Sequence, residues 1–160
     1  MDYLYIIREA LVWIVTIFWL YQIMVSLCSL VKIKDKPLQV KKDHKFMAII
    51  PAHNEEAVVG NLVESLKKQN YNKDLYDIYV IADNCTDNTA KVAKEAGAIV
   101  YERFNNSKKT KGYALDWFLQ QKIKEDAPYD AFFIFDADNI VDPDFIKNMN
   151  IKLCQGEDVV

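Results

Sequence analysis

Cysteine and histidine are scarce in this sequence, and neither is arranged for metal binding. Cys28, Cys85 and Cys154 are the only cysteines in 160 residues. They form neither a Cys-x-x-Cys pair nor a cysteine–histidine cluster, so we expect reduced thiols facing a cytosolic compartment or lipid. His44 and His53 have no metal-ligand partner in sequence, so neither is assigned a catalytic role. Positive charge is not in excess either: the formal net charge of −3 gives no basic signature of nucleic-acid binding.

Charge is absent from one long stretch near the N-terminus. Ala10 to Val31 contains no charged residue, and its roughly 22 residues would span about 33 Å as a helix, enough to cross a hydrocarbon core of about 30 Å. A signal peptide would need a basic start and a small-residue cleavage site, whereas Asp2, Arg8 and Glu9 precede this run and no Ala-x-Ala follows it. A buried core helix of this length without a polar stripe would be unusual in so small a protein. We therefore expect residues 1–31 to form a single-pass membrane anchor.

A basic linker follows the apolar run. The charged residues of segment 32–45 are Lys32, Lys34, Asp35, Lys36, Lys41, Lys42, Asp43 and Lys45. The excess of lysine places this side in the cytoplasm by the positive-inside rule. The segment could also lie against anionic headgroups, at about 1 kcal/mol per basic residue; a solvated topology signal is the alternative.

From Phe46 onward, short apolar runs alternate with amphipathic segments. The expected strands cover residues 46–51, 77–82, 98–102 and 130–136. The expected helices cover residues 55–69, a segment capped by Thr86 or Asp87 and stopped at Gly97, residues 111–125, and a last helix capped by Asp142 with Pro143 as its first residue. This alternation predicts an α/β domain with a mostly parallel sheet, in strand order 3-2-1-4. Ligands of such sheets bind beyond the carboxyl ends of the strands.

The most informative polar group, Asp136-Ala137-Asp138, stands at the end of the fourth expected strand. Extended chain would point its two carboxylates to opposite sides, but a turn can bring them together. Converged carboxylates repel unless a hard divalent cation lies beside them. The pattern therefore indicates a Mg²⁺ or Mn²⁺ site completed by substrate phosphates. A pair of loop aspartates that caps the next helix is the alternative, weakened because Asp142 is the better cap.

The loops after the first two strands offer groups that suit a nucleoside. Pro51 to Glu55 presents backbone amides and carbonyls that could hydrogen-bond a planar base edge, although Glu55 also suits the first turn of a helix. An ionised Asp83 could accept a hydrogen bond from a base N–H or a ribose hydroxyl. Both loops are therefore candidates for one nucleoside site.

A lysine-rich segment precedes the third expected helix. A lysine beside a helix N-terminus makes an anion site that suits a diphosphate, and Lys111 holds that position. Gly112 lets the backbone come close to such a ligand. The alternative is an exposed basic loop.

The order of these motifs resembles the family 2 glycosyltransferases. Pro-x-x-Asn-Glu follows the first strand, Asp-Asn the second, Lys-Gly-x-Ala-Leu opens the third helix, and Asp-Ala-Asp follows the fourth strand. The resemblance covers residues 46–160, and the apolar N-terminal run fits membrane-bound branches of the family. It implies a GT-A fold, which is a Rossmann-like nucleotide-sugar-binding domain, of which this chain would be the N-terminal portion.

The resemblance also implies roles for single residues. The donor-binding residues that it implies are Pro51, Ala52, Glu55, Asp83, Lys111 and Asp136. The first three would line a uridine pocket, Asp83 would read the base or the ribose, and Lys111 would lie near the diphosphate. Asp136 and Asp138 match the metal motif, with Asp138 preferred as the direct ligand.

The implied activity is that of an inverting hexosyltransferase-type enzyme of polysaccharide biosynthesis. It would use a nucleotide-diphospho-sugar, with a UDP-sugar as the expected donor, Mg²⁺ or Mn²⁺, and a saccharide or lipid acceptor at the cytoplasmic side of the cell membrane. No nucleic-acid partner is implied. The general base of the family comes from a motif beyond the D-x-D, so we expect no catalytic base before Val160. On that expectation the chain holds the donor and metal half and is inactive alone.

Two other functions stay open. One is a non-catalytic, membrane-anchored binder of nucleotide-sugars. The other is a nucleotidyltransferase, which shares the α/β layout and the acidic metal site, but which favours a glycine-rich basic loop after the first strand.

Overall fold

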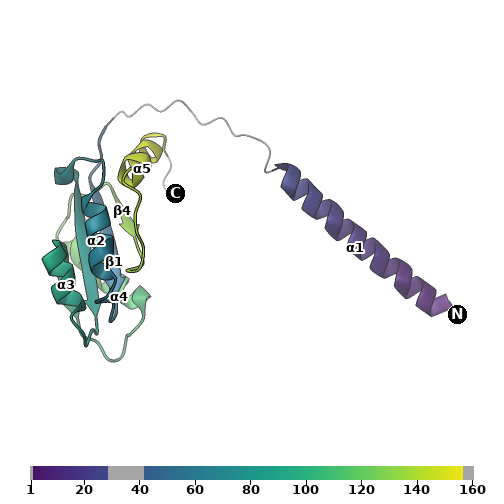
Figure 1. The fold of residues 1–160 in the computed structure, drawn as a ribbon, viewed down its shortest axis with the longest axis horizontal. Helices are drawn as coiled ribbons and strands as arrows, with labels where there is room; N and C mark the ends of the chain where they lie inside the picture. The colour runs from purple at the N-terminus through teal and green to yellow at the C-terminus, as the bar shows by residue number, and fades with distance from the viewer. Residues whose placement is uncertain (1, 29–41, 157–160) are drawn as a thin grey trace. The chain divides into compact units, whose positions relative to one another are not determined.

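The computed structural model describes residues 2–28 and 42–156, which fall into two units (Figure 1). The first unit lies within residues 1–37 and the second within residues 38–160. Most of the predicted basic linker, including Lys32 to Lys41, lies outside the described residues.

The first unit is one helix, α1, which covers Asp2–Cys28. Within Tyr3–Cys28, the most apolar window of 18 residues has a mean hydropathy of 2.0 and none of it is buried within the protein, so the length and composition of this helix suffice to cross a membrane. The helix begins eight residues before the charge-free run at Ala10, and it therefore includes Arg8 and Glu9, whose side chains pair at 2.8 Å.

The second unit is built on a four-stranded parallel sheet. Its strands are β1 (Phe46–Ala52), β2 (Tyr76–Asp83), β3 (Ile99–Arg103) and β4 (Ala131–Ile134). They pair in the order β3-β2-β1-β4, and every pairing is parallel. The predicted fold class and strand order are thereby confirmed. The central strands β1 and β2 are the most buried, because helices cover both of their faces.

Helices pack on the two faces of the sheet in two separate cores. They are α2 (Val59–Lys67), α3 (Thr89–Ala96), α4 (Lys111–Lys124) and α5 (Phe145–Cys154), with a 3₁₀ turn at Lys73–Leu75. One core joins apolar side chains of α2, α3 and α5 to the sheet. The other is formed by α4, whose Ala114 and Phe118 pack on the opposite face. This arrangement leaves the carboxyl ends of the strands open between the two layers.

Two of the predicted helix starts are wrong, each by a short segment. The helix expected at Glu55 begins at Val59, because the carbonyl of Glu55 accepts from the amides of Val58 and Val59 in a turn. The helix expected at Pro143 begins at Phe145. Asp142 still accepts from the Asp144 amide at 2.8 Å, as a cap would.

The reason for the later start of α5 lies at Pro143. Its carbonyl accepts from the Asn70 amide at 2.7 Å, which ties it to the end of α2. The expected end of α3 at Gly97 is confirmed. Gly97 has a φ of 101°, a left-handed backbone conformation that residues other than glycine rarely adopt.

Candidate functional site

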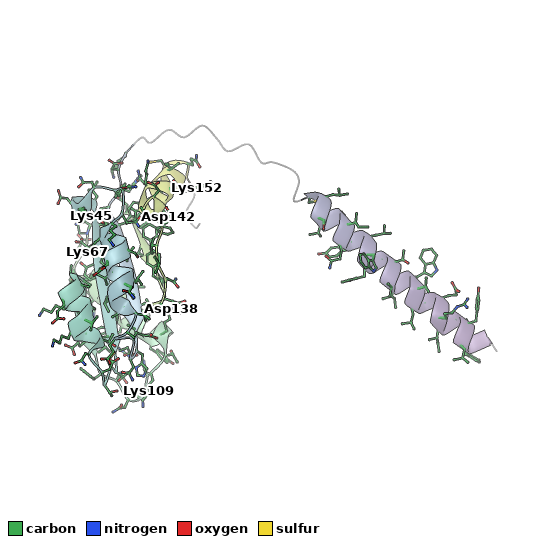
Figure 2. All side chains as sticks on the ribbon, in the orientation of Figure 1. Lys45, Lys67, Lys109, Asp138, Asp142 and Lys152 are labelled. Atoms are coloured by element: carbon green, nitrogen blue, oxygen red, sulfur yellow. The ribbon has the colours of Figure 1, made fainter. Side chains whose placement is uncertain are left out.

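The carboxyl ends of β1, β2 and β4 meet the start of α4 around one cavity of about 330 Å³. Its lining residues are Pro51, Ala52, His53, Glu55, Asp83, Lys109, Lys111, Ala114, Asp136, Ala137 and Asp138. All six residues that the sequence nominated for donor binding are among them, as are both nominated metal ligands. Figure 2 shows Asp138 and Lys109 in the lower half of this unit, away from Lys45 and Lys152.

The loop after β1 is fixed by hydrogen bonds to the loop after β2. Asn54 adopts a left-handed φ of 56°, which asparagine tolerates better than most residues. Its side-chain oxygen accepts from the Thr86 amide at 2.8 Å, and the Glu55 amide donates to the Thr89 hydroxyl at 2.8 Å. The backbone that presents Ala52 and Glu55 to the cavity is therefore held in one shape.

Asp83 closes the cavity from the end of β2 and carries a buried charge pair. Its Oδ1 accepts from Nη1 of Arg103 at 2.5 Å, and the two side chains are only 7% and 5% exposed. The Asn84 amide group donates to the same oxygen at 3.1 Å. Buried carboxylates need such partners, since an unpaired charge in the interior is strongly unfavourable. Asp83 is thus an oriented, charge-compensated acceptor.

The loop of residues 104–110 between β3 and α4, called the lysine loop below, supplies positive charge on the opposite side together with the start of α4. Lys111 is the first residue of α4, so its ammonium lies beside the helix N-terminus. It forms an ion pair with Oδ1 of Asp136, in which the side chains are 45% and 66% exposed. Lys109 also lines the cavity. Two lysines and a helix start make this side suited to a phosphate group.

Asp136 and Asp138 stand in the turn that follows β4. The carbonyl of Asp136 accepts from the Asn139 amide at 3.1 Å, and Ala137 between the two is buried at 5% exposure. Both aspartates line the same cavity, and Asp138 also borders a second cavity beside Asn139 and Phe145.

These two carboxylates suit a hard divalent cation that completes its shell with ligand oxygens. Within residues 2–28 and 42–156, no group of three or more histidine, cysteine, aspartate or glutamate side chains is arranged to hold a metal ion.

Three residues at the site, Arg103, His53 and Lys109, were assigned no role from the sequence. Arg103 ends β3 at the same edge and pairs with Asp83, a role that could have been suspected from its position after a strand. His53 lines the cavity, and its Nδ1 lies 2.7 Å from the backbone carbonyl oxygen of Asp83. Because a carbonyl oxygen can only accept, Nδ1 of His53 donates this hydrogen bond. Nearby, burial raises the pKa of the Cys85 thiol.

Known proteins resemble this chain in sequence. The family model "Glycosyl transferase family 2" matches residues 47–160. A dolichyl N-acetyl-alpha-D-glucosaminyl phosphate 3-beta-D-2,3-diacetamido-2,3-dideoxy-beta-D-glucuronosyltransferase of Methanococcus voltae is 33% identical over 67% of this chain and 33% of its own length. Protein RfbJ of Shigella flexneri is 30% identical over 63% of this chain and 73% of its own length. Two further curated relatives are matched over about a quarter of their length, so the chain spans only a part of most of them.

Solved structures resemble it in fold. A mannosyltransferase from Pyrobaculum calidifontis in complex with GDP-Man and Mn²⁺ has a TM-score of 0.67 at 18% identity, over 83% of this chain and 39% of that one. A glucosyl-3-phosphoglycerate synthase from Mycobacterium tuberculosis in complex with Mg²⁺ and UDP has a TM-score of 0.55 at 25% identity, over 71% of this chain and 41% of that one. The sheet described above is therefore that of GT-A enzymes.

Proposed function

Because this chain belongs to glycosyl transferase family 2, we propose that it binds a nucleotide-diphospho-sugar in the cavity at the carboxyl edge of its sheet. The activity of the whole protein would be transfer of a hexose-type sugar to a saccharide or lipid acceptor. The observation that carries the proposal is that all seven residues predicted to bind the donor or the metal line one cavity of about 330 Å³. We propose UDP as the nucleotide, since the resemblance favours uridine and one structural relative binds UDP.

We propose that the nucleoside lies against the ends of β1 and β2. Pro51, Ala52 and Glu55 would border the base, with the backbone held by the bonds of Asn54 and Glu55 to the neighbouring loop. Asp83 would accept from a base N–H or a ribose hydroxyl. Its partner Arg103 orients this carboxylate by donating to Oδ1, and a carboxylate paired with a guanidinium group serves as a hydrogen-bond acceptor.

We propose that the diphosphate lies between Lys111 and the two aspartates. Asp136 and Asp138 would hold Mg²⁺ or Mn²⁺, which neutralises charge on the departing nucleoside diphosphate. The ammonium of Lys111, beside the N-terminus of α4, would bind a phosphate oxygen of the same group. Two carboxylates alone are a weak site, so the donor itself would complete the coordination.

The acceptor side is proposed from the relatives. Inversion at the anomeric carbon needs a carboxylate that deprotonates the acceptor hydroxyl, and we place that base in a part of the whole protein that this chain does not span. The Methanococcus voltae relative is named for a dolichyl-linked sugar phosphate, which supports a lipid-linked saccharide as acceptor. We propose that α1 anchors the protein in the cell membrane, with the domain in the cytoplasm, where such an acceptor and a soluble donor meet.

Calorimetry of the full chain in detergent tests the donor proposal. UDP should bind in the presence of Mg²⁺ or Mn²⁺, and binding should weaken when the metal is chelated. Adenosine diphosphate serves as the control, because the diphosphate is kept while the base is changed. Failure to bind UDP or GDP with metal present would refute the proposal; equal binding of all diphosphates would refute the nucleoside site.

A further inference from the structure

We infer that Arg103 is a positioning residue that joins the nucleoside side of the cavity to its diphosphate side. The inference rests on the proposed function, because it states how two halves of that site are held together. Arg103 does not itself line the cavity, whereas its partner Asp83 does. The consequence is that loss of the arginine fork should weaken recognition of the diphosphate even though Arg103 touches no phosphate.

The first link is the buried pair. Asp83 and Arg103 are direct register partners at the ends of β2 and β3. Nη1 of Arg103 donates to Oδ1 of Asp83 at 2.5 Å, and both side chains are almost completely buried. A charge-assisted bond of this kind fixes the orientation of the carboxylate that faces the cavity.

The second link runs from the same guanidinium to the lysine loop. Nη2 of Arg103 donates to the carbonyl oxygen of Lys108 at 2.8 Å. That carbonyl belongs to the peptide bond that leads into Lys109, which lines the cavity. The planar guanidinium group of Arg103 thus donates from one nitrogen to the Asp83 carboxylate and from the other to the backbone of the lysine loop.

The side chains of Asn84, directly after β2, and of Asn105, near the start of the lysine loop, reinforce this link. The Asn105 amide donates to the side-chain oxygen of Asn84 at 2.7 Å. The side-chain oxygen of Asn105 in turn accepts from the amides of Ser107 and Lys108, each at 3.0 Å. The start of the loop is therefore tied to the end of β2 at one point and folded back on itself at another. Arg103 supplies the remaining tie, at the point where the loop turns toward the cavity.

Lysine at position 103 separates the charge of Arg103 from its geometry. Lysine keeps a cation beside Asp83, but its single ammonium group cannot reproduce two parallel donors in a rigid fork. Arg103→Lys should therefore keep the Asp83 carboxylate paired with a cation, but lose the hydrogen bond to the carbonyl oxygen of Lys108 in the lysine loop. A purely structural role predicts something different, namely an equal loss of affinity for every ligand.

The test compares uridine with UDP on the full chain in detergent with Mg²⁺, by calorimetry. The affinity advantage of UDP over uridine should fall about tenfold in Arg103→Lys, as expected for loss of bonds between charged groups, while uridine affinity stays within about threefold. The loss should also be non-additive with Lys109→Gln, because both changes remove the same lysine from the phosphate. Hydrogen exchange should become faster at the amides of Ser107 and Lys108.

Asn105→Ala is a second variant for the case in which Arg103→Lys does not fold. Asn105 is half-buried, and its loss removes the side-chain oxygen that accepts from the amides of Ser107 and Lys108 in the same loop. It should lower the UDP advantage in the same direction, and Asn106→Ala, at the next and exposed position, should leave it unchanged. An unchanged UDP advantage in Arg103→Lys or Asn105→Ala overturns the inference alone. A wild-type chain that binds neither UDP nor GDP overturns the proposed function and this inference with it. If GDP binds in place of UDP, guanosine and GDP replace the ligand pair.

Discussion

Lys111 and Asp136 form an ion pair that joins the first turn of α4 to the turn after β4, within the lining of the cavity. Each partner is also proposed to bind part of the donor complex, Lys111 a phosphate and Asp136 a cation. The pair is largely exposed, and exposed ion pairs contribute about 0–1 kcal/mol. A divalent cation therefore needs little free energy to displace Lys111 from Asp136, which leaves the ammonium available for the phosphate.

Replacing Lys111 by glutamine should have opposite effects on the two ligands. Mn²⁺ alone should bind equally well or slightly more tightly, because Asp136 loses a competing cation worth at most about 1 kcal/mol. UDP in the presence of metal should bind about tenfold more weakly, because a charged hydrogen bond to phosphate is lost. Mn²⁺ binding is read by electron paramagnetic resonance and UDP binding by calorimetry.

Lys124→Gln is the matched control, since it removes a lysine from the other end of the same helix. It should change neither affinity. Weaker Mn²⁺ binding in Lys111→Gln would contradict the competition described here, and unchanged UDP binding would remove Lys111 from the phosphate site.

Asp138→Asn should weaken the metal-dependent part of UDP binding more than any other single change in the Asp-Ala-Asp turn. The carboxylate of Asp138 is exposed and lines the cavity, so its loss removes a hard oxygen ligand without leaving a buried group unpaired. Affinity for UDP measured with Mg²⁺ should fall about tenfold or more, as for other charged contacts, and affinity measured after chelation should not change.

Asp116→Asn serves as its control, because Asp116 is an exposed carboxylate on α4 that does not line the cavity. If the Asp138 variant kept the full metal-dependent affinity, the Asp-Ala-Asp turn would be only a loop between β4 and α5.

The fold and the edge that carries the cavity could be predicted because both follow from local patterns. Apolar runs such as Phe46–Ala52 alternate with amphipathic segments, and that alternation favours parallel strands with crossovers. Parallel strands bring their carboxyl ends to one edge, so residues as distant as Ala52 and Asp136 could be expected to meet. The structure brings both to the same cavity.

The pairing of Asp83 with Arg103 could not be predicted in the same way. It depends on the register of β2 against β3, which places these two residues opposite each other across a pairing that no local pattern specifies. The predicted starts of α2 and α5 were wrong for a related reason. Tertiary hydrogen bonds, from the Glu55 amide to Thr89 and from the Asn70 amide to Pro143, hold those segments in turns.

The N-terminal helix should keep the chain in membranes. Because Tyr3–Cys28 is long and apolar and buries nothing within the protein, extraction with high salt or alkaline carbonate should leave the chain in the pellet, and detergent should release it. A variant without residues 1–37 should appear in the soluble fraction and still bind UDP with metal, because the cavity lies wholly within the second unit.

Orientation needs a separate measurement. In sealed inside-out vesicles, protease should cleave the segment 32–45 of the full chain, since its lysines predict a cytoplasmic position. Release of the full chain by carbonate would refute the anchor, and protection of this segment in inside-out vesicles would refute the orientation.

Tyr71 should make the domain lose stability at alkaline pH. Its hydroxyl donates to the carbonyl oxygen of His44 at 2.8 Å, and burial, aided by the negative charge of Asp43, raises its pKa to about 12. In the unfolded chain the pKa of a tyrosine is about 10. Between these values the unfolded state has lost the proton that the folded state still holds, so the free energy of unfolding falls as pH rises. The contribution is complete below about pH 10 and is lost as pH rises toward about 12.

Comparison with Tyr71→Phe isolates this group. At pH 7 the variant should be about 1 kcal/mol less stable than the wild type, because one hydrogen bond is lost. That difference should shrink as pH rises above about 10, since phenylalanine cannot ionise in the unfolded chain. Thermal unfolding followed by near-ultraviolet circular dichroism at several pH values gives both quantities. Tyr113→Phe, at an exposed tyrosine on α4, controls for the removal of a tyrosine hydroxyl. A difference in stability between wild type and Tyr71→Phe that stays constant up to about pH 12 would mean that Tyr71 ionises alike in both states.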